Sequence, residues 1–219
     1  MKYRGDMQIA VILAVLLALV IAYLFGVGWQ LRRIVERWHG RRWGGRFVAI
    51  AGAALFTASP YLSYKGLELR YVLARVPDPL HALWIEYRLE RSWGIGLPGD
   101  NETGFVIYRL TGGSADWARR MGPRLVEGLG GSGVWQPTPV CDDQSGRWSG
   151  GSKLRNAAHR PDFRNYLSRY GFEVPVDRVR IDEANRVVRN PGAFYRYGRG
   201  GSITVIHPAQ GKVYFAYAG

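Results

Sequence analysis

The chain has 219 residues, 47% of them hydrophobic, and a formal net charge of +13, which allows one membrane anchor and one folded domain of ordinary size. A single cysteine, Cys141, excludes an intrachain disulfide. Residues 1–64 hold eight basic and two acidic side chains, a balance of +6, and the remaining +7 suits an acidic partner without being specific for nucleic acid. We therefore predict no nucleic-acid partner.

The first apolar stretch, residues 7–31, contains no charged residue and is longer than the roughly 20 residues that a helix needs to cross a bilayer. It also exceeds the apolar core of a cleaved signal peptide, and Trp29, Gln30 and Leu31 follow in place of a small-residue cleavage site. We predict an uncleaved transmembrane helix at about residues 7–31.

A second uncharged run covers residues 47–64. It is shorter, rich in alanine and interrupted by Pro60, and its small residues at 51–54 would let it pack closely against the first helix. We predict a second crossing at about residues 46–64. The alternative is a buried helix of the folded domain.

The connection at residues 32–46 decides the predicted orientation. Basic residues beside membrane segments stay in the cytoplasm, so this arginine-rich loop is expected inside and both chain ends outside. The anchor would then be residues 1–64 and the extracytoplasmic domain residues 65–219, which in a bacterium means the inner membrane and the periplasm. If the second run does not cross, the domain is cytoplasmic instead. The arginines of the loop, which we assign to the membrane interface, are Arg32, Arg33, Arg37, Arg41, Arg42 and Arg46.

The first part of the domain contains two predicted strands. Residues 67–76 suit either a strand or a continuation of the membrane-proximal helix. Residues 83–93 alternate apolar and polar side chains, with Leu83, Ile85, Tyr87 and Leu89 on one face. Residues 105–110 form the next strand, and the two would pair as a hairpin across the glycine-rich connection at 94–104.

The middle of the domain is predicted to be mainly helical. Ser114 is a suitable N-cap, Trp117, Met121 and Leu125 form an apolar stripe, and Gly122-Pro123 should kink this helix. A loop-like stretch follows at residues 128–153. Residues 161–170 predict a helix, residues 176–181 a short strand, and residues 183–189 a short helix.

The last part of the domain predicts a three-stranded meander at residues 193–197, 202–207 and 212–218, separated by turn residues. The final strand is apolar on both faces and should lie inside a sheet. The predicted fold is therefore a two-helix transmembrane anchor followed by a single α+β domain with an antiparallel sheet and a C-terminal β-meander.

No motif in the sequence names a reaction. The glycines of 94–99 match G-x-G-x-x-G, but Pro98 and acidic residues follow where that motif requires a helix, so we interpret them as a tight connection. Cys141 with His159 or His207 makes a poor nucleophile–base pair, because neighbouring carboxylates disfavour the thiolate. No ligand spacing typical of a metal site is present, and we predict no metal and no cofactor.

Two groups of polar residues are candidate sites. The denser one would bind a carboxylate or phosphate, with two arginines sharing one helix side if the helix starts early; it comprises Arg155, Asn156, His159, Arg160 and Arg164. The other consists of loop carboxylates that would supply an acid and a base, namely Asp100, Glu102, Asp142 and Asp143.

The leading hypothesis is a bacterial inner-membrane protein whose periplasmic domain is a non-catalytic binding module. Its partners would be the lipid bilayer and another envelope protein or an incoming protein, as in an envelope-complex subunit or an immunity-type protein. The alternative is a membrane-anchored envelope hydrolase that uses the loop carboxylates. A cytoplasmic nucleic-acid binder would require the opposite topology.

Overall fold

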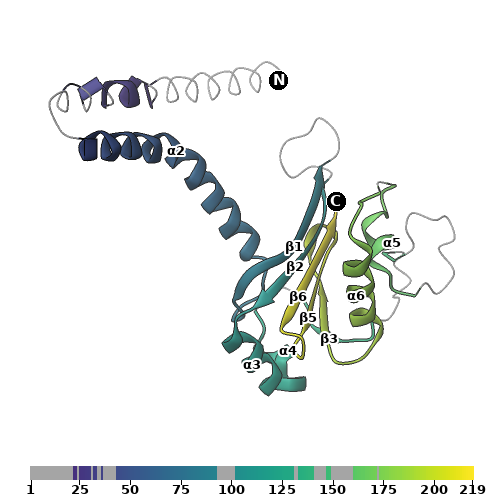
Figure 1. Ribbon diagram of the computed structural model, residues 1–219. Coiled ribbons are helices and arrows are strands. Elements are labelled where there is room, and N and C mark those ends of the chain that lie inside the picture. The colour runs from purple at the N-terminus through teal and green to yellow at the C-terminus, as the bar shows by residue number, and fades with distance from the viewer. Residues whose placement is uncertain are drawn as a thin grey trace, which may run out of the picture. The chain divides into compact units, whose positions relative to one another are not determined.

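The chain divides into two compact units, Met1–Arg70 and Tyr71–Gly219. The computed structural model describes residues 22–23, 25–30, 32–33, 36, 43–92, 102–130, 133–140, 147–148, 160–171 and 173–219. All statements below about structure concern these residues. Figure 1 shows the order of the elements along the chain.

The described part of the first unit is helical. Helix α2 (Trp43–Leu73) contains the second apolar run, has Pro60 inside it and continues past residue 64. Of the two structures predicted for residues 67–76, a strand or a continuing helix, the helix is therefore confirmed up to Leu73. Earlier in the unit, the ring of Tyr23 stacks on Phe56 with centroids 5.5 Å apart.

The predicted two-helix anchor is not supported by the described residues. None of the helices found there combines the length and the apolar character that crossing a membrane requires. Most of the first predicted span, residues 7–31, lies outside the described residues.

The second unit is an α+β domain, as predicted. Its six strands form one antiparallel sheet in the order β1-β2-β6-β5-β4-β3. The predicted β1–β2 hairpin and C-terminal meander are confirmed, and β6 is internal to the sheet. The strands are β1 (Ala82–Ser92), β2 (Glu102–Leu110), β3 (Gln136–Pro137), β4 (Phe194–Tyr197), β5 (Ser202–His207) and β6 (Lys212–Ala218), and the helices of this unit are α3 (Gly112–Met121), η1 (Gly122–Arg124), α4 (Leu125–Gly128), α5 (Phe163–Leu167), α6 (Arg178–Arg189) and η2 (Arg199–Gly201).

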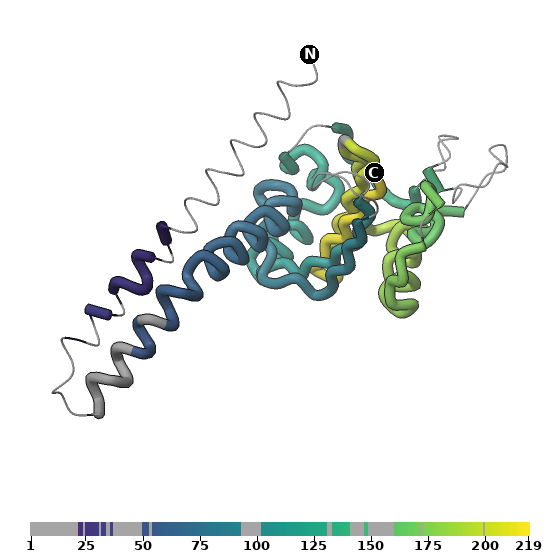
Figure 2. The backbone as a smooth tube through the Cα atoms, turned by 90° about the horizontal axis from the view of Figure 1, so that it is seen from above, coloured from purple at the N-terminus to yellow at the C-terminus, as the bar shows by residue number. Residues whose placement is uncertain are grey.

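The central strands of the sheet are buried on both faces. In β2, Phe105 and Ile107 belong to one hydrophobic cluster, whereas Val106 and Tyr108 belong to another; successive side chains of a strand point to opposite faces. Helices α5 and α6 cover the first face, and α3, α4 and residues 72–80 cover the second. Figure 2 shows the yellow C-terminal strand between teal segments on one side and the green helices on the other.

A bulge in β1 changes which side chains share a face. The pairing with β2 shifts between Ile85 and Tyr87, so an extra residue is inserted there. Ile85 packs against the second cluster, whereas Tyr87 and Leu89 pack against the first. The sequence prediction that Leu83, Ile85, Tyr87 and Leu89 share one face is therefore wrong, because strict alternation assumes an unbroken register.

Capping residues explain three further differences from the predicted helices. Thr111, not Ser114, caps α3. Asp162 caps α5, which ends at Leu167 and is shorter than the predicted 161–170. Asp177 accepts hydrogen bonds from the backbone N–H groups of Val179 and Arg180 and so starts α6, which replaces the predicted strand at 176–181.

Phe105→Ala should destabilise the second unit by about 3–5 kcal/mol, because it leaves a cavity in a closed core. The ring is fully buried and lies 5.4 Å from that of Phe163 and 6.2 Å from that of Tyr87. Denaturant unfolding followed by tryptophan fluorescence measures the change. Val179→Ala is the control, since Val179 is 69% exposed and its loss should cost less than about 0.5 kcal/mol. Equal effects of the two substitutions would contradict the assigned core.

Candidate functional site

The predicted arginine-rich group is only partly described. Arg155, Asn156 and His159 lie outside the described residues. Arg160 and Arg164 are exposed, and Arg160 precedes the Asp162 cap and lies outside α5. The condition under which the two arginines would share one side of a helix, an early helix start, is therefore not met.

The loop carboxylates are not brought together by the described residues. Asp100, Asp142 and Asp143 lie outside them, as does Cys141. Glu102 opens β2, and its carbonyl oxygen accepts a hydrogen bond from the backbone N–H of Gly219 at 3.0 Å. In the part of the chain that the structure describes, no group of histidine, cysteine or acidic residues is arranged to hold a metal ion.

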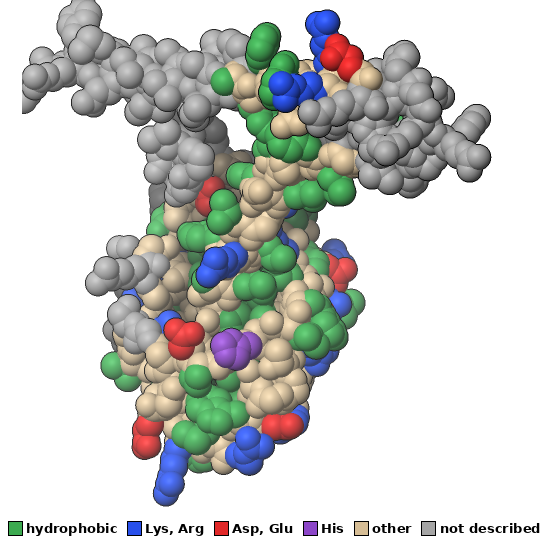
Figure 3. All heavy atoms as spheres, turned by 90° about the vertical axis from the view of Figure 1, so that its left-hand side faces the viewer, with side chains coloured by type: hydrophobic (Ala, Val, Ile, Leu, Met, Phe, Trp, Pro, Cys, Tyr) green, Lys and Arg blue, Asp and Glu red, His purple; other side chains and the backbone are tan. Residues whose placement is uncertain are grey.

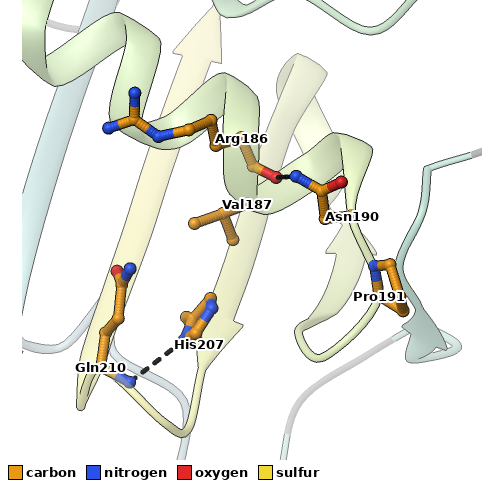
Figure 4. A pocket seen from close by; sticks show the side chains of 6 residues that line it. All are labelled: Arg186, Val187, Asn190, Pro191, His207 and Gln210. Atoms are coloured by element: carbon orange, nitrogen blue, oxygen red, sulfur yellow. Dashed lines mark hydrogen bonds between the residues drawn. The ribbon is translucent and has the colours of Figure 1, made fainter.

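A pocket opens between the C-terminal half of α6 and the turn that joins β5 to β6 (Figure 4). Its volume is about 210 Å³. Figure 4 shows His207 and Gln210 on the sheet side and Val187 directed into the space between helix and sheet. The residues that line the pocket are Arg186, Val187, Asn190, Pro191, His207 and Gln210.

His207 is the last residue of β5 and has a defined hydrogen-bonding role. Its Nδ1 accepts from the backbone N–H of Gln210 at 3.1 Å. Burial lowers the pKa of the imidazole, with the Glu183 carboxylate raising it and the Lys212 ammonium lowering it. The ring is therefore neutral at pH 7, and with Nδ1 acting as the acceptor, Nε2–H is its remaining donor.

The helix side of the pocket is built by the end of α6. The side-chain nitrogen of Asn190 donates to the carbonyl oxygen of Arg186 at 2.8 Å, and its backbone N–H donates to the same oxygen at 3.2 Å. These bonds cap the helix and leave the side-chain oxygen of Asn190 as an acceptor. Val187 is buried and forms an apolar wall, and Arg186 is exposed.

A network of charged side chains lies next to the pocket and fixes α6 to the sheet. Lys212 Nζ donates to Glu183 of α6 at 2.5 Å and to Glu86 of β1 at 2.8 Å. Arg180 Nη1 lies 2.6 Å from Glu86 Oε1. The Tyr214 hydroxyl lies 2.7 Å from Glu183 Oε1 and 3.0 Å from the side-chain oxygen of Gln210, which connects the network to the pocket.

Electrostatics in this network favour the ionised carboxylates. Burial on its own would raise the pKa of Glu86 and of Glu183, but Lys212 together with neighbouring cations and hydrogen-bond donors more than offsets it, and both pKa values are lowered. The β1 bulge directs Glu86 toward α6, since Glu86 is the extra residue between Ile85 and Tyr87.

Sequence reasoning missed this pocket. The sequence predicted His207 as an ordinary histidine at a strand end and residues 190–192 and 208–211 as turns. The pairing of His207 with Lys212 closes the β5–β6 hairpin, and the packing of α6 on that face brings the two turns together. Comparisons with protein-family models, curated proteins and solved structures found no match, so no family is assigned to the chain.

Lys212→Met should destabilise the second unit by about 3 kcal/mol at pH 7, because it leaves two mostly buried carboxylates with fewer cations. The lowered carboxyl pKa values contribute stability above the ordinary pKa near 4.3, and that contribution is lost as the pH falls further. In the variant these carboxyls protonate at higher pH. The difference in the free energy of unfolding between wild type and variant, measured by denaturant unfolding, should therefore become smaller from pH 7 to pH 4.

Arg119→Met is the control for this experiment. Arg119 pairs with Asp116 on the surface, with side chains 49% and 52% exposed, so its loss should cost less than about 1 kcal/mol. A Lys212→Met effect no larger than this, or one that does not change with pH, would rule out a stabilising role for the network.

Proposed function

We propose that this chain is a bacterial inner-membrane protein that residues 1–64 hold in the bilayer. Its folded domain lies in the periplasm and acts as a non-catalytic binding module for another envelope protein or an incoming protein. The observation that carries the proposal is a set of six large apolar side chains of α2 within residues 1–64 that are 45–69% exposed, namely Ile50, Leu55, Phe56, Tyr61, Leu62 and Tyr64. Figure 3 shows green hydrophobic side chains at the surface of this helix.

The placement of these side chains favours a helix that is surrounded by lipid. At about 100° per residue, the six positions are distributed around the whole circumference of the helix, and residues 47–64 contain no charged side chain. A helix that is apolar on all sides is covered by protein core or by lipid. Burying each such side chain is worth roughly 1.5–3 kcal/mol.

The charges before α2 support the proposed orientation. Arg33 lies 4.0 Å from the ring centroid of Trp29, an arrangement suited to the headgroup layer, where tryptophan and basic residues gather. Arg32 pairs with Glu36 at 2.7 Å. With the arginine-rich loop in the cytoplasm, a helix that crosses after it carries the second unit to the outer side.

A binding role for the domain is supported by the arrangement of its charges. Around the pocket, Glu86 and Glu183 are engaged with Lys212 and Arg180, which stabilises the fold and leaves exposed arginines at the surface. The excess positive charge of the domain favours an acidic partner.

Leu55→Arg should disfavour the second crossing, because an arginine at the centre of a lipid-exposed helix costs about 2.5–3.5 kcal/mol. The first proposed span would still hold the chain in the membrane, so part of the protein should keep its domain on the cytoplasmic side. Protease treatment of intact spheroplasts, followed by immunoblotting of a C-terminal tag, measures the protected fraction. Val179→Arg is the matched control, since Val179 is 69% exposed on the folded domain and should leave the domain accessible to protease. A domain protected from protease in wild-type spheroplasts would contradict the proposed topology.

The binding role is tested by purification of the tagged full chain in mild detergent after crosslinking in cells. We expect one or more envelope proteins to co-purify in stoichiometric amounts and to be lost when the crosslinker is omitted under high salt. Recovery of the chain alone under both conditions would contradict a binding module.

A further inference from the structure

We propose that the pocket between α6 and the β5–β6 turn binds a carboxylate group, either of a small free carboxylic acid or of an acidic side chain or chain end of a protein partner. This inference rests on the proposed binding function and names the chemistry that the domain recognises. The pocket supplies hydrogen-bond donors and a positive charge beside an apolar wall.

Arg186 provides the charge. It is exposed and makes no ion pair with any residue that the structure describes. Its neighbour one helical turn earlier, Glu183, is already engaged by Lys212 and Tyr214 at 2.5 and 2.7 Å. Arg186 lines the pocket, and Figure 4 shows its side chain extending along α6 with the guanidinium directed away from His207. A change of rotamer would turn the guanidinium toward the pocket, where it would favour a planar anion that can accept two parallel hydrogen bonds.

His207 provides the donor on the sheet side. Because Nδ1 accepts the backbone N–H of Gln210, Nε2–H is available to a ligand oxygen. An imidazolium would place a second donor, Nδ1–H, against the Gln210 N–H, so we expect the ring to stay neutral when it binds a ligand oxygen. The charged groups that act on the ring are Glu183 and Lys212, which oppose each other.

The end of α6 opposes an anion in the pocket, because the C-terminus of a helix carries partial negative charge on its unpaired carbonyl groups. Two of these groups have partners: the carbonyl of Arg186 accepts from Asn190, and that of Val188 accepts from the backbone N–H of Val140 at 2.8 Å. These two bonds reduce the negative charge that a ligand would meet.

Size and charge limit the ligand to a small monoanion. The volume of about 210 Å³ is below the roughly 300–1,000 Å³ of pockets for drug-sized ligands. One unpaired arginine and a neutral histidine suit the single charge of a carboxylate better than a phosphate dianion. Val187 and Pro191 offer apolar contact to the carbon atoms that follow the carboxylate.

The test uses the full chain in mild detergent, labelled with ¹³C in histidine, and follows the His207 ring by NMR during titration with propionate. We expect saturable shifts with a Kd on the order of 1–10 mM and no saturation with propionamide. His207→Gln and Arg186→Gln should each weaken binding about tenfold. Arg178→Gln, an exposed arginine at the start of the same helix, should leave it unchanged.

A second arm identifies the source of the carboxylate. A short peptide with a free C-terminal carboxylate that binds at least tenfold more tightly than propionate, and loses that gain when amidated, assigns the site to a protein partner. Equal affinities assign it to a small free acid. Absence of saturable shifts with both probes, or equal weakening by Arg186→Gln and Arg178→Gln, would overturn the assignment. The proposed function would survive that result if the chain still fractionated with membranes and still co-purified with its crosslinked partner.

Discussion

Strand β2 has no polar face, and the architecture of the domain follows from that constraint. Phe105, Val106, Ile107 and Tyr108 are all fully buried, so the sheet needs cover on both sides. The two covers come from different parts of the chain: residues 72–80 with α3 and α4 on one side, and α5 with α6 on the other.

The first cover makes the end of α2 part of the domain core. Val72 is 1% exposed, and its carbonyl oxygen accepts a hydrogen bond from the Tyr108 hydroxyl at 2.8 Å. Arg75 follows, lying 4.9 Å from the ring centroid of Tyr217 and pairing with Glu90 at 2.5 Å. The residues that leave the apolar helix are thus bonded to two different strands of the sheet.

The second cover creates the candidate site. Helix α6 is held to the sheet by its buried apolar side chains and by the Lys212 network, so its C-terminal half has a defined position over the β5–β6 turn. The bulge in β1 contributes, because it directs Glu86 into this network while Tyr87 and Leu89 remain in the core. The proposed pocket depends on both features.

The strands of the domain were predictable because local patterns determine them. The β1–β2 hairpin and the C-terminal meander follow from alternating side chains and turn residues, and the internal position of β6 follows from its two apolar faces. The faces of β1 were not predictable, since a bulge leaves no periodic signal. The residues at 176–181 suited a strand by composition, but the Asp177 cap started a helix there.

The candidate site was less predictable than the fold. Its residues come from turns separated by about twenty positions and meet only through packing of α6, which no short motif records. His207 alone was noticed, and its role depends on a backbone donor, Gln210, that sequence reasoning cannot place. The arginine-rich group at 155–164 and the loop carboxylates remain predictions, since most of their members lie outside the described residues.

The proposed membrane anchor accounts for the exposed apolar surface of α2, and cysteine accessibility tests it most directly. In a Cys141→Ser background, Leu55→Cys and Val179→Cys variants would be treated in spheroplasts with a membrane-impermeant maleimide. We expect rapid labelling at position 179 and none at position 55 until the protein is unfolded in sodium dodecyl sulfate. Labelling at position 55 as fast as at position 179 in intact membranes would contradict it.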